Sequence, residues 1–212
     1  LYAHPIYAKE LTAGTIFRWA AHENTILNQI KEQLLSYTQV PGDKANLIKF
    51  IESITNDADR SIVDLNEIAV RCYFHPETQG STSIKKVLPA VLKTSKLLKD
   101  EYSKPISDNL SSLNFPETFV WFQEYNGNTI DPYELLKRYA IDLFIGTASN
   151  LSKEKLLIAE GGAAAMAYAR PQFEDIGTQE RNNIMNALLR YCELDTLAMV
   201  LILRAWLDWC ES

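Results

Sequence analysis

The chain has 212 residues, which suits one large or two small domains and allows a substantial buried core. Its 47% hydrophobic and 23% charged residues are ordinary for a globular protein, and its formal net charge of -6 excludes a generally basic protein that coats nucleic acid. The longest apolar run, residues 197–203, is far shorter than the roughly 20 residues of a membrane span, so we expect no membrane association.

The first half of the chain alternates short strands with helices. Residues 15–20 are β-branched and aromatic, which predicts a strand, and apolar residues at helical spacing follow it. In chain order, the predicted elements are a strand at 15–20, helices at about 23–36 and 45–54, a short buried strand at 61–65 and a helix at about 66–73.

The second half is dominated by helices. Ser83 is the expected N-cap of a helix. Pro89 falls within that segment and is expected to kink or delay the helix. Residues 102–160 are expected to form an ordered insertion. Further helices are predicted at about 131–144, from Ser152, at 163–169 and at 178–209. The class predicted by these elements is a helix-rich α/β fold.

Few residues suit a cysteine or histidine metal site. The three cysteines are odd in number and form no Cys-x-x-Cys pair, which favours a reducing cytoplasm over a disulfide framework. The three histidines form no metal-binding pair. The chain begins at Leu1 without an initiator Met, so we expect an upstream domain of the same polypeptide.

The last predicted helix carries the sharpest chemical signal. Tyr191 and Asp195 are four residues apart, so they share the helix face that also holds apolar Leu188 and Ala198. A carboxylate on that face is costly unless it is paired or bound to a metal. Asp195 is therefore either a structural pairing or capping residue or a metal ligand.

Glu23 is a second candidate. It directly follows the first predicted strand, and such positions line active sites in open α/β sheets. By itself, however, an acid in the first turn of a helix is explained by the helix dipole.

These residues resemble a known superfamily. Residues 191–196, Tyr-Cys-Glu-Leu-Asp-Thr, resemble the third motif of the DnaQ-like 3′-5′ exonucleases of the ribonuclease H-like superfamily, and the tyrosine is typical of their DEDDy branch. Glu23 with Leu27 resembles the second motif, although His22 stands where the family usually has Phe and Trp19 where it usually has Asn.

The resemblance is closer to a bacterial domain family of unknown function with the same core. It covers nearly the whole chain and includes residues 17–24, 80–89, 131–133 and 190–196. The resemblance implies one ribonuclease H-like exonuclease domain over 1–212, the C-terminal part of that domain, with its first strands missing.

The resemblance also implies a chemistry. Two divalent ions, Mg²⁺ or Mn²⁺, about 3.5–4 Å apart would be held by four carboxylates. Asp195 and Glu23 would be metal ligands, Tyr191 would orient the attacking water, and Ser83 and Lys85 would lie nearest the substrate. The expected partner is single-stranded DNA or RNA, digested from its 3′ end.

The first motif of that family, Asp-x-Glu on the opening strand, is absent from residues 1–212. We expect it upstream of Leu1, and we expect this chain alone to be inactive. The alternatives are a catalytically degenerate module within a larger bacterial protein, which binds nucleic acid or protein, and a purely structural module inside a larger defence or repair protein.

Two weaker patterns have plain structural explanations beside the functional ones. Five lysines could follow a phosphate backbone, but a solvated helix face is the favoured explanation. They are Lys85, Lys86, Lys93, Lys96 and Lys99. An aromatic set could stack bases, but a satellite core is favoured. Its members are Phe115, Phe119, Trp121, Phe122 and Tyr125.

Overall fold

The computed structural model describes residues 14–37, 42–55, 58, 60–106, 112–144, 168–169 and 172–211, and for 139–144 the backbone alone. The chain divides into two compact units, Leu1–Phe74 (unit 1) and His75–Ser212 (unit 2), and each is described by itself. The single domain expected over 1–212 stays a prediction. The described residues confirm a helix-rich α/β class with little sheet.

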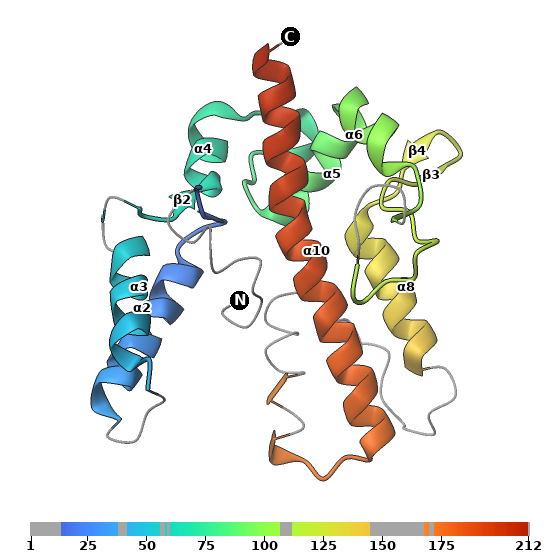
Figure 1. The fold of residues 1–212 in the computed structure, drawn as a ribbon. Coiled ribbons are helices and arrows are strands. Elements are labelled where there is room, and N and C mark those ends of the chain that lie inside the picture. Colours follow the sequence, from blue (N-terminus) through green and yellow to red (C-terminus); the bar gives the residue numbers. More distant parts are fainter. Residues whose placement is uncertain are drawn as a thin grey trace. The chain divides into compact units, whose positions relative to one another are not determined.

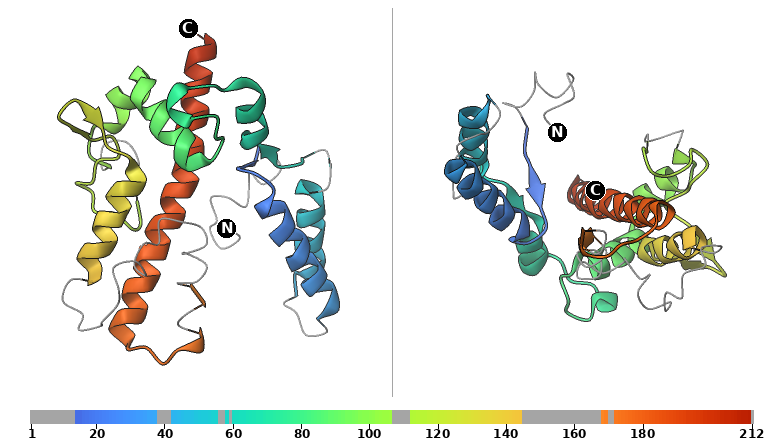
Figure 2. Two further views of the ribbon diagram at one scale, coloured as in Figure 1. Left: turned by 180° about the vertical axis from the view of Figure 1, so that it is seen from behind. Right: turned by 90° about the horizontal axis from the view of Figure 1, so that it is seen from below.

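Unit 1 is built around a pair of parallel strands. In chain order it contains β1 (Phe17–Arg18), α2 (His22–Ser36), α3 (Lys44–Ile54), β2 (Val63–Asp64) and α4 (Leu65–Cys72). The strands pair with Phe17 opposite Val63 and Arg18 opposite Asp64. Parallel strands need a long connection. The helices α2 and α3 supply it and lie side by side (Figures 1 and 2).

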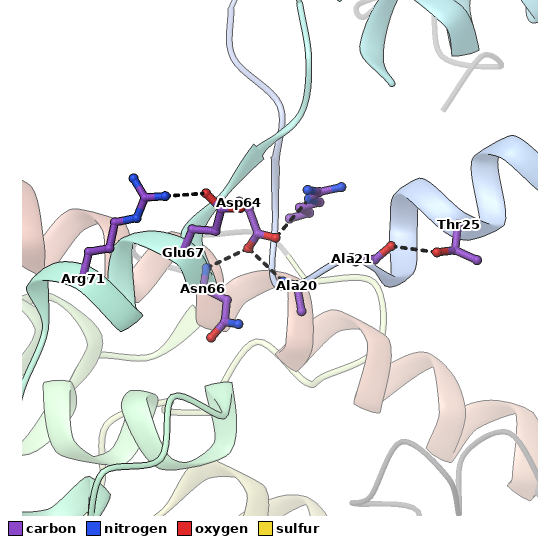
Figure 3. Close-up of polar contacts among 8 residues, drawn as sticks. Ala20, Ala21, Thr25, Asp64, Asn66, Glu67 and Arg71 are labelled. Atoms are coloured by element: carbon purple, nitrogen blue, oxygen red, sulfur yellow. Dashed lines mark hydrogen bonds and ion pairs between the residues drawn. The ribbon is translucent and has the colours of Figure 1, made fainter. Parts of the chain in front are cut away.

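Asp64 is the polar centre of unit 1. Its Oδ1 accepts hydrogen bonds from the backbone N–H of Asn66 at 2.9 Å, which caps α4, and of Ala20 at 3.0 Å (Figure 3). Its Oδ2 lies 3.2 Å from Nε of Arg18, and both side chains are largely buried. One carboxylate therefore fixes the ends of both strands and the start of α4.

Unit 2 is a set of helices packed against one long helix. In chain order its elements are a 3₁₀ turn (Pro76–Thr78), α5 (Ile84–Thr94), α6 (Lys96–Tyr102), β3 (Glu124–Tyr125), β4 (Asn128–Thr129), α8 (Pro132–Phe144) and α10 (Thr178–Glu211). The 34-residue α10 packs against α8, α5 and α6 (Figures 1 and 2).

The core of unit 2 follows the helical period of α10. Buried apolar residues lie along it at the spacing of one helix face, at Ile184, Ala187, Leu188, Tyr191, Leu194, Leu197, Ala198, Leu201, Ile202 and Ala205. This spacing is that of a single apolar stripe. The stripe predicted from the sequence is thus the face that α5 and α8 cover.

The aromatic set forms a satellite core, as favoured from the sequence. The rings of Phe115, Phe119 and Trp121 lie 4.5–4.8 Å apart between centroids. They and Phe122 are at most 5% exposed, whereas Tyr125 is 70% exposed. Four of the five rings are therefore unavailable for stacking on bases.

Some elements differ from the sequence prediction. Pro89 lies inside α5, which continues to Thr94. The short helix α6 and the antiparallel β3–β4 hairpin were not predicted. The helix expected from Ser152 lies outside the described residues. The helix expected at 163–169 also lies outside them, except for residues 168 and 169. No helix in the described ranges has the length and apolar character of a membrane span.

The network around Asp64 gives a first prediction. Asp64→Ala leaves the buried Arg18 unpaired and removes the cap of α4, at a cost of about 3 kcal/mol to unit 1. Hydrogen exchange of the Ala20 and Asn66 amides should accelerate by about tenfold or more, because both lose an acceptor. Asp43→Ala is the control, because Asp43 precedes α3 without a side-chain capping bond. Equal effects of the two substitutions would contradict the prediction.

Candidate functional site

The candidate site of unit 2 begins with two residues one turn apart on α10. Tyr191 is 8% exposed, and Asp195 on the same face is half-buried. Oδ1 of Asp195 accepts a hydrogen bond of 2.7 Å from the hydroxyl of Tyr133. The carboxylate on the apolar face therefore has a partner within unit 2, as burial requires.

Tyr133 is fixed by the start of α8. Its backbone N–H donates to Oδ1 of Asp131 at 2.9 Å, and Pro132 is the first helical residue. Proline suits this position because it has no N–H to satisfy and its φ is already helical. Only 3% of Tyr133 is exposed, so its ring is held by packing on all sides.

Lys85 on α5 lies beside the two tyrosines. Its Nζ lies 5.6 Å from the ring centroid of Tyr133 and 5.5 Å from that of Tyr191. An ammonium group at this distance is attracted by the faces of both rings. Lys85, Tyr133, Tyr191 and Asp195 together are called the tyrosine–aspartate cluster below.

Ser83 stands two residues before Lys85. It occupies the N-cap position of α5, as predicted, but its side chain makes no capping hydrogen bond. The residue is exposed. Its hydroxyl is therefore placed at a helix N-terminus, where backbone N–H groups attract anions.

Burial and the Asp195 charge act together on both phenols of the cluster. Burial raises the pKa of Tyr133 strongly, and the charge and hydrogen bond of Asp195 raise it further. The pKa of Tyr191 is raised by the same causes in the same order. Both phenols are therefore harder to deprotonate than an ordinary tyrosine.

Glu23 lies in unit 1, in the first turn of α2, as predicted. Its Oε2 is buried and has no hydrogen-bond partner in the part of the chain that the structure describes. An orphaned carboxylate oxygen fits a cation ligand, because leaving it unpaired costs free energy. Asp195 belongs to unit 2, so a metal cluster shared by Glu23 and Asp195 stays a prediction.

The donors fit Mg²⁺ or Mn²⁺ in kind, since carboxylate oxygens are the ligands that these ions prefer. Among the described residues, no group of three or more His, Cys, Asp or Glu side chains is close enough together to hold a metal. Asp195 would supply one ligand, and the others would have to come from elsewhere.

The lysine stretch is largely neutralised by acids. Lys93 pairs with Glu77, Lys96 with Asp100 at 2.7 Å, and Lys99 with Glu124 at 2.8 Å. These pairs support the solvated-face explanation over a phosphate track. Lys85 differs, because it faces the two rings of the cluster.

Sequence reasoning missed Tyr133 as a member of the site. It is 62 residues from Asp195, and no periodic pattern joins the two positions. The available signal was the order Asp-Pro-Tyr at 131–133, which places the tyrosine in the first turn of a helix. That order predicted α8 but not the partner of its tyrosine.

Comparisons of the chain with protein-family models, with curated proteins and with solved structures find no match.

The cluster predicts a change in tyrosine titration. Asp195→Asn removes the negative charge that disfavours phenolate, so the pKa values of Tyr133 and Tyr191 should both fall. Absorbance of tyrosinate against pH measures this. Glu193→Gln makes the same charge change two residues away, at a carboxylate bonded to Asn114, and should leave both titrations in place. Identical curves for the two variants would refute the coupling.

The raised pKa values also predict how stability depends on pH. Above a pH of about 10, the ordinary pKa of tyrosine, the unfolded chain loses phenol protons that Tyr133 and Tyr191 keep when folded. The folded chain then binds more protons, so the free energy of unfolding falls as pH rises, by about 1.4 kcal/mol per pH unit for each tyrosine. Tyr133→Phe should show a shallower fall in urea denaturation. Equal slopes in both proteins would contradict this.

Proposed function

We propose that the chain is the C-terminal part of a ribonuclease H-like, DnaQ-like exonuclease domain that removes nucleotides from the 3′ end of single-stranded DNA or RNA. The observation that carries this proposal is the tyrosine–aspartate cluster. Tyr191 and Asp195, the pair in the third-motif pattern, lie on one face of α10 with Lys85 over the tyrosine ring.

The resemblance to the exonucleases implies a role for each residue. Two divalent ions, when bound, would supply the charge that activates water and stabilises the leaving 3′ oxygen. Asp195 would hold one ion, and Glu23 would be a further ligand beside the two carboxylates of an Asp-x-Glu motif, as the resemblance implies. Tyr191 is protonated at neutral pH, as an ordinary tyrosine is, so its hydroxyl can orient the attacking water.

Ser83 and Lys85 would bind the substrate phosphate. Ser83 contributes an exposed hydroxyl at the start of α5, and Lys85 contributes a positive charge beside Tyr191. Lys85 is a member of the cluster, and Ser83 stands two residues before it. Substrate contact would thus be local, as the net charge of -6 requires. The site of action is proposed to be the cytoplasm.

One observation favours a second candidate function. Oδ1 of Asp195 accepts a hydrogen bond from the hydroxyl of Tyr133 within unit 2. A catalytically degenerate module, which binds nucleic acid or a protein and does not cleave, needs no more than that. The first motif decides between the two functions, because an exonuclease requires Asp-x-Glu upstream of Leu1.

The decisive assay uses the polypeptide extended upstream of Leu1, with Mn²⁺ and single strands whose 3′-terminal nucleotide carries the label. The wild type should release labelled nucleotides. Asp195→Asn should lower the rate about 100-fold or more, because it withdraws a ligand of the ions that stabilise the transition state. Glu193→Gln should retain activity, because Glu193 is bonded to Asn114 outside the cluster.

The same assay separates the two candidates. A wild type as inert as Asp195→Asn on both DNA and RNA would exclude the exonuclease. Binding of the strands without cleavage would then support the degenerate module.

A further inference from the structure

We draw no further inference here: the strongest candidate, the exposed apolar face of α10 that carries Met185, Leu189, Val200 and Leu207, is left aside because nothing in the part of the chain that the structure describes shows what covers it.

Discussion

A carboxylate on the apolar face of a long helix is the constraint on which unit 2 depends. Asp195 interrupts the buried stripe of α10, and a charge in such surroundings needs a hydrogen-bond partner. Tyr133 provides this partner from the start of α8. Lys85 on α5 lies over the rings of Tyr133 and Tyr191. Three helices are thereby held in one arrangement around a single negative charge.

The same constraint explains what the sequence could predict of the site. Tyr191 and Asp195 share a face because they are four residues apart, and this follows from helix geometry alone. The apolar character of the face predicted that Asp195 must be paired or bound. The identity of the partner was unpredictable, because Tyr133 reaches it only through the packing of α8 on α10.

Elements were predictable where the local pattern was strong. Helix α2 begins within one residue of its predicted start, and both strands of unit 1 lie within their predicted ranges. The two-residue strands are shorter than predicted, because β-branched residues continue beyond the few positions that pair. Asp64 was predicted only as a strand residue. Its bonds to Ala20 and Arg18 join positions 44 and 46 residues away, which no local pattern reports.

Asp64 also has a consequence for how unit 1 can diverge. Its one carboxylate sets the alignment of β1 with β2, because it holds Arg18 and the Ala20 amide beside the start of α4. Backbone bonds between the strands add to it, and one of them runs from the N–H of Val63 to the carbonyl of Ile16 at 2.9 Å. Relatives can therefore differ by insertions and deletions in α2, in α3 or between them without a change in the strand register. Relatives should therefore differ in length between β1 and β2, whereas residues 18–20 and 64–66 should keep the same register.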